Sequence, residues 1–136
     1  MSSSVLQLQD RLQAASTDYQ KLQNDLSVIV EARQRLDAQL QENELVKKEF
    51  QYLTPNNTVY KLIGPVLVQQ DQAEAKSNVD KRLEFIQGEI KRVEGQIEEI
   101  GERSEKKKLE IVEIQTALQQ MRQVNPAASS PAAIPA

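Results

Sequence analysis

The sequence predicts a mainly α-helical protein, in which a long antiparallel two-helix coiled coil carries a single β-hairpin inserted between the helices. In two long segments, apolar residues recur at alternating steps of three and four, the spacing of a helix that buries a narrow stripe against another helix. A short segment between them is rich in β-branched and aromatic residues. Hydrophobic residues make up 39% of the chain and aromatic residues only 4%, which suits a narrow seam better than a thick globular core.

The first helix is expected over residues 5–53. It should end near Leu53, because Pro55 disfavours helical geometry at the residue before it. Arg33 interrupts the apolar stripe, and after Asn43 the stripe changes phase, so that Val46, Phe50 and Leu53 continue it one residue out of step. The regular part of the stripe consists of Val5, Leu8, Leu12, Ala15, Tyr19, Leu22, Leu26, Ile29, Leu36 and Leu40.

A β-hairpin is expected over residues 58–70. Two antiparallel helices can be joined by about 2–8 residues, and the connection here is longer than that. Thr58–Ile63 and Val66–Gln70 are β-prone, and Gly64-Pro65 between them is a turn dipeptide. An isolated hairpin is marginally stable in water and has two unpaired edges, so we expect several such hairpins to join into one sheet or barrel. The alternative is a loop that packs on its own helix ends.

The second helix is expected over residues 71–124. Asp71 followed by Glu74 is a helix start signal, and Asn125-Pro126 is a stop signal. The domain therefore spans residues 1–124, and residues 125–136, rich in Pro, Ala and Ser, are expected to be disordered. The stripe consists of Val79, Leu83, Ile86, Ile90, Val93, Ile97, Ile100, Ile111, Ile114, Leu118 and Met121.

Two polar residues, Ser104 and Lys107, take stripe positions in the second helix, roughly opposite Gln20 and Thr17 if Leu53 lies beside Asp71. We expect the part of the coiled coil near the chain termini to be weaker there and to open for an apolar partner. The alternative is that these polar positions only set the register of the helices.

The composition excludes several classes of function. The chain has no Cys and no His, so zinc sites, thiolate nucleophiles and imidazole catalysis are not expected, and neither enzyme activity nor a cofactor is predicted. The formal net charge of -3 does not favour a nucleic-acid or membrane surface. No signal peptide and no membrane-spanning run are recognised, so a cytoplasmic protein is expected.

The chain resembles a β-type prefoldin subunit. The most specific part of the resemblance is the run Val59–Val68 between two heptad helices, supported by Leu53-Thr54 before it and by Lys81–Ile86 and Glu89–Arg92 after it. The resemblance implies a hetero-hexamer of α-type and β-type prefoldin subunits, whose hairpins form a central barrel assembly. It also implies an ATP-independent holding chaperone that binds unfolded actin-like and tubulin-like clients and passes them to the cytosolic group II chaperonin.

Two sets of candidate site residues follow. The expected assembly hairpin consists of Val59, Tyr60, Leu62, Ile63, Gly64, Pro65, Val66, Leu67 and Val68. Antiparallel pairing places both termini at one tip, where the expected client contacts are Val5, Leu6, Leu8, Leu12, Leu118, Met121 and Val124. A function from another class stays open, namely a structural coiled-coil tether or assembly subunit that binds no client.

Overall fold

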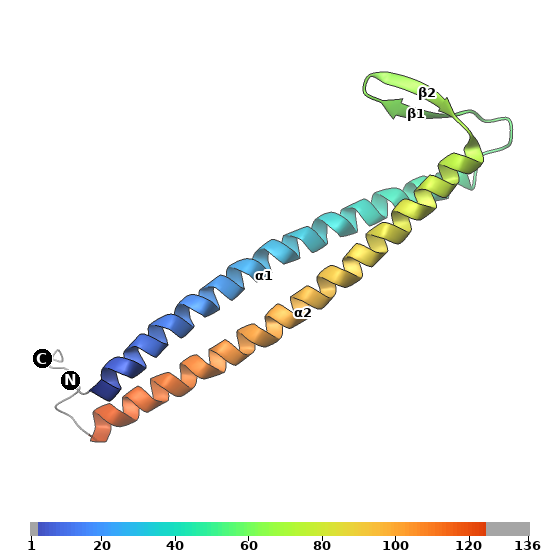
Figure 1. The fold of residues 1–136 in the computed structure, drawn as a ribbon. Coiled ribbons are helices and arrows are strands. Elements are labelled where there is room, and N and C mark those ends of the chain that lie inside the picture. Colours follow the sequence, from blue (N-terminus) through green and yellow to red (C-terminus); the bar gives the residue numbers. More distant parts are fainter. Residues whose placement is uncertain (1–2, 125–136) are drawn as a thin grey trace, which may run out of the picture. The chain divides into compact units, whose positions relative to one another are not determined.

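The computed structural model describes residues 3–124 and has two long helices with an antiparallel hairpin between them. The order is α1 (Ser3–Phe50), β1 (Val59–Ile63), β2 (Val66–Gln70) and α2 (Gln72–Val124), as Figure 1 shows. The predicted fold class is confirmed. The tail 125–136, expected to be disordered, lies outside the described residues.

The helix ends lie close to the residues expected from the sequence. α1 already includes Ser3 and Ser4 and ends at Phe50 rather than at Leu53. The next three amides, from Gln51 to Leu53, bond to carbonyls three residues back, the tighter pattern that often ends an α-helix. In α2, Asp71 is the cap and not the first helical residue, because its Oδ2 accepts a hydrogen bond of 3.0 Å from the Glu74 amide.

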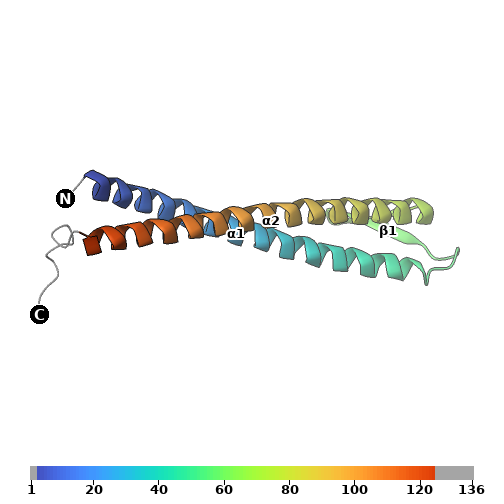
Figure 2. The ribbon, with the colours of Figure 1, turned by 90° about the horizontal axis from the view of Figure 1, so that it is seen from below.

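The helices form two compact units, a terminal unit and a hairpin unit. In the terminal unit, residues 3–28 pair with residues 97–124, and the start of α1 lies beside the last turn of α2 in both views (Figures 1 and 2). This unit has a buried apolar core cluster, and four half-buried side chains pack against that cluster, namely Leu8, Leu12, Ile111 and Met121. The core cluster itself consists of Val5, Ala15, Ile114 and Leu118.

The hairpin unit comprises residues 29–96. Here the buried residues all belong to α2, whereas the facing stripe of α1, such as Leu36 and Leu40, is only half-buried. Ion pairs of 3.0 Å between Arg33 and Glu94 and of 3.2 Å between Lys47 and Asp80 join the antiparallel helices. The buried residues are Ala75, Val79, Leu83, Ile86, Ile90 and Val93.

The polar positions of the seam find partners in the terminal unit. Ser104 is buried, and its Oγ accepts a hydrogen bond from Gln23 Nε2. Lys107 pairs with Asp18. These partners lie three residues and one residue along α1 from Gln20 and Thr17, which were expected as approximate positions, so the register of the helices is slightly shifted from the expected one.

The hairpin turn is made by Gly64 and Pro65. Gly64 has a φ of 59°, and the proline ring holds the next φ negative, which is the sequence of signs in a type II′ turn. Ile63 pairs with Val66 directly across this turn. A residue with a Cβ would be strained at Gly64, so the turn residue and the strand register are linked.

Candidate assembly and client-binding surfaces

The hairpin leaves the apolar side chains of both its faces exposed. Pairing of Leu62 with Leu67 and of Tyr60 with Gln69 defines one face, on which Leu62 is 68% and Leu67 64% exposed. Ile63, paired with Val66, belongs to the opposite face and is also exposed. A hairpin that covered one face with its own helices would bury one of these two sets, so the folded-back loop is not what this chain forms.

The hairpin also has free backbone edges. In an antiparallel ladder the hydrogen-bonded pairs alternate with pairs whose N–H and C=O groups point outward. Because Ile63 and Val66 flank a two-residue turn, they form a hydrogen-bonded pair, and the outward groups belong to Leu62 on β1 and Leu67 on β2. In the two-stranded sheet of the described chain, both edges can therefore accept a further strand.

The segment before the hairpin is held by a small hydrogen-bond network. The Thr54 amide donates to Asn57 Oδ1 at 2.6 Å, and the Asn57 amide donates back to the Thr54 carbonyl at 3.0 Å. Gln72, in the first turn of α2, donates from Nε2 to the carbonyls of Thr54 and Asn57. Side chains from both ends of the connection, Asn57 and Gln72, thus hold the segment that joins α1 to the hairpin.

The predicted tip residues are brought together at the terminal end of the helix pair, but their exposure differs. Val5 and Leu118 are buried in the core cluster, and Leu8, Leu12 and Met121 pack against it. Leu6 and Val124, which lie off the stripe, are 49% and 86% exposed. Val124 and Met121 line a shallow hollow of about 340 Å³ together with Ala117 and Gln120. The apolar surface open to a partner therefore centres on Leu6, Met121 and Val124.

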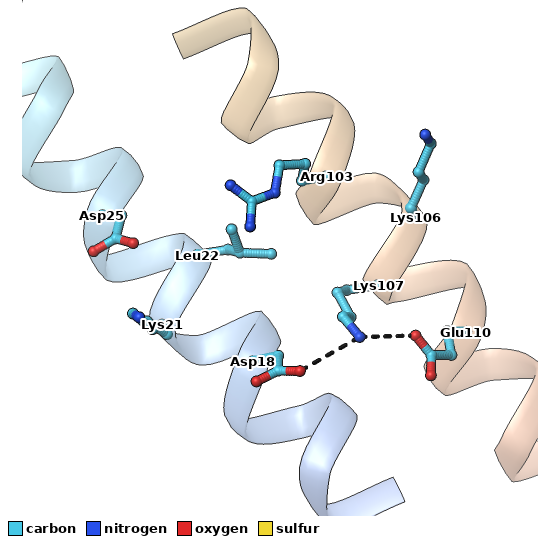
Figure 3. Close-up of a pocket in the computed structure, with 8 residues that line it drawn as sticks. All are labelled: Asp18, Lys21, Leu22, Asp25, Arg103, Lys106, Lys107 and Glu110. Atoms are coloured by element: carbon cyan, nitrogen blue, oxygen red, sulfur yellow. Dashed lines mark hydrogen bonds and ion pairs between the residues drawn. The ribbon is translucent and has the colours of Figure 1, made fainter. Parts of the chain in front are cut away.

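A charged groove of about 560 Å³ crosses the terminal unit (Figure 3). Lys107 reaches Glu110 at 3.0 Å and Asp18 at 3.4 Å. The hydrogen bond to Glu110, with help from Asp18, raises the pKa of Lys107 above its ordinary value despite partial desolvation. Arg103 and Lys106 line the same groove. Basic and acidic groups are mixed along it, as on a solvated helix face, and the pair of Lys107 with Asp18 links the two helices.

Sequence reasoning missed eight exposed large apolar side chains outside the two predicted surfaces, namely Val28, Val30, Leu45, Val46, Tyr52, Phe85, Leu109 and Val112. Of these, Val30, Leu45, Val46, Tyr52 and Phe85 belong to the hairpin unit. The phase change of the stripe after Asn43 was the available signal for Leu45 and Val46.

Over the described residues 3–124, no helix is long and apolar enough to cross a membrane, and no group of three or more acidic side chains could hold a metal ion.

Comparison with known proteins gives a consistent family. The family model described as "Prefoldin subunit" matches residues 13–121. The chain is 44% identical to human prefoldin subunit 6 over 112 residues, which is 82% of this chain and 87% of that protein. It is 49% identical to the Saccharomyces cerevisiae prefoldin subunit 6 over 96 residues, 71% of this chain and 84% of that one.

The fold has a counterpart among solved structures. The crystal structure of the prefoldin β subunit from Thermococcus strain KS-1 superposes with a TM-score of 0.70 and covers 79% of this chain and 92% of that chain. The two sequences are 22% identical, so this likeness bears on the fold alone.

Proposed function

The chain belongs to the prefoldin family of chaperone subunits, and from this premise we propose that it acts in a hetero-hexamer of α-type and β-type prefoldin subunits as an ATP-independent holding chaperone. In the cytoplasm, the assembly binds unfolded or nascent proteins of the actin and tubulin class at its coiled-coil tips and delivers them to the cytosolic group II chaperonin.

The observation that supports assembly most strongly is the hairpin with two free edges and two apolar faces. Unpaired edge groups favour pairing with a strand of another chain. Exposed leucines on one face and Ile63 and Val66 on the other favour burial against further apolar surface. A single subunit leaves these groups in water, whereas neighbouring hairpins satisfy them.

Client binding is supported by the terminal end of the helix pair. Val124 is exposed in the hollow that it lines with Met121, whose flexible thioether side chain adapts to irregular apolar partners, and Leu6 is exposed near the start of α1. An unfolded chain exposes short apolar segments without fixed shape, and such a small adaptable surface suits it. Several tips in one assembly can then hold one client at several points, which raises the overall affinity.

The test is suppression of aggregation of denatured actin by the reconstituted hetero-hexamer. A Leu6→Ser, Val124→Ser double variant should assemble normally and lose most of its holding activity, since both side chains are exposed and leave the core cluster intact. A Val28→Ser, Leu109→Ser variant is the matched control, because these residues are similarly exposed in the terminal unit but do not line the hollow.

The rival is a coiled-coil tether without client binding. It is favoured by one observation, that Val5 and Leu118 at the tip are closed into the core cluster rather than open to a partner. A wild-type assembly that forms but fails to suppress aggregation would select the tether. Holding activity that survives the tip substitutions would place the client elsewhere on the assembly.

A further inference from the structure

The phase change in the stripe of α1 corresponds to a polar stretch of the seam in the hairpin unit. Asn43 and Lys47 occupy the positions that continue the stripe from Leu40 toward α2. Lys47 pairs with Asp80 at 3.2 Å, and Asn43 Oδ1 accepts a hydrogen bond of 3.5 Å from Arg82. The seam is thus held by polar contacts here, and the apolar residues of this stretch lie elsewhere on the helix.

Leu45 and Val46 are those apolar residues, and they point away from the seam. Leu45 is 64% and Val46 44% exposed. The chain's own hairpin does not cover them, because its leucines are exposed at the same time. Burial of these two adjacent aliphatic side chains against an apolar surface of another chain would remove them from water and favour association.

The surroundings of this two-residue patch indicate the shape of its partner. Among the positions three and four residues away from Leu45 and Val46, only Phe50 is apolar, and it is half-buried, so the patch does not extend into an exposed stripe. A partner helix needs apolar side chains repeated over several turns, so it would find too little surface here. A compact apolar element such as the end of a β-hairpin fits a patch of this length. The flanking positions are Gln41, Glu42, Lys48 and Glu49.

The hairpin also has an exposed apolar face that needs a partner. Its two faces are both apolar near the turn, so a barrel interior can bury one face and leaves the other in water. In both views the hairpin is turned back toward the helices of its own unit rather than away from them (Figures 1 and 2). The strands therefore lie at the level of the last turns of α1 in the same unit.

We propose that Leu45 and Val46 form a second assembly surface, which covers the outer aliphatic face of a hairpin from a neighbouring prefoldin subunit. The inference rests on the proposed assembly through hairpins and adds a contact between a helix and a hairpin. Each hairpin is then buried on both faces, one inside the barrel and one under the α1 helix of a neighbour.

The absence of cysteine in the chain permits a direct test by thiol alkylation. Single variants Leu45→Cys, Val28→Cys and Leu62→Cys are reacted with iodoacetamide, as free chains and in the reconstituted hetero-hexamer. The three native side chains are similarly exposed, at 64%, 63% and 68%, so their free-chain rates should be comparable. On assembly, the Leu45→Cys and Leu62→Cys variants should react at least about tenfold more slowly, as buried thiols do, and the Val28→Cys variant should keep its rate.

The outcomes separate the two proposals. If Leu62→Cys is not protected and sedimentation shows no hexamer, assembly through the hairpin fails. If Leu62→Cys is protected but Leu45→Cys reacts as fast as in the free chain, only the second surface is overturned. A photoreactive residue at position 46 should cross-link to the hairpin of a neighbouring subunit, and a cross-link only within the same chain would also overturn the proposal.

Discussion

Replacing the two leucines that pair across the hairpin should weaken assembly without unfolding the helices. Leu62 and Leu67 are opposite one another on one face, and neither contributes to the seam between α1 and α2. A Leu62→Ser, Leu67→Ser double variant therefore removes exposed apolar surface that the proposed assembly would bury under a neighbouring subunit. The helical content measured by circular dichroism should stay at the wild-type level.

The size of the effect follows from the exposed fractions. Complete burial of a leucine side chain is worth about 1.5–3 kcal/mol. About two thirds of each side chain is still exposed, so burial on assembly contributes roughly 1–2 kcal/mol per leucine. The double variant should lose about 2–4 kcal/mol, which corresponds to a dissociation constant about 30- to 700-fold higher.

Sedimentation velocity over a titration with the partner prefoldin subunits measures this constant. The Val28→Ser, Leu109→Ser variant serves as the control, since these two side chains are 63% and 61% exposed but lie on the helices. The reasoning would be refuted by an unchanged dissociation constant for the hairpin variant, or by an equal loss in the control.

Two further predictions concern the turn and the terminal unit. Gly64→Ala forces a Cβ into a φ of 59°, which should cost about 1–2 kcal/mol and weaken assembly about 5- to 30-fold. The control Gly101→Ala in α2, with open space around it, should leave assembly unchanged. The same sedimentation titration compares the two variants, and equal dissociation constants would contradict the role of the turn. If the helix pair opens first where Ser104 and Lys107 occupy the seam, amides of residues 8–16 should exchange hydrogen about tenfold faster or more than those of residues 80–93 in the assembled complex. Equal protection by mass spectrometry would mean that the polar pair only sets the register.

The hairpin surface could be predicted from the sequence because its signals are local. β-branched residues on both sides of Gly64-Pro65 specify strands, and the turn dipeptide specifies where they reverse. Once the register is known, the alternation of a strand assigns Leu62 and Leu67 to one face and Ile63 and Val66 to the other.

The tip was predicted less completely, because burial there depends on which residues of the other helix are opposite. Val5, Leu6 and Leu8 are equally apolar in sequence, yet only Leu6 is exposed. The stripe period separates Leu6 from its neighbours, but the hollow beside Met121 needs the positions of side chains on α2. At Leu45 and Val46 the phase change of the stripe was a signal in the sequence, but only the partners of Asn43 and Lys47 on α2 show which residues face the seam.

By itself, the sequence determined two long helices, one hairpin and the family, since each of these depends on periodicity, turn chemistry or short motifs within a continuous stretch of chain. Only the tertiary structure decided which stripe residues are buried, that Ser104 is paired with Gln23, and that Asn43 and Lys47 turn Leu45 and Val46 outward. The physical reason is that burial and ion pairing are properties of two segments far apart in sequence, and they are set by the register in which the helices meet.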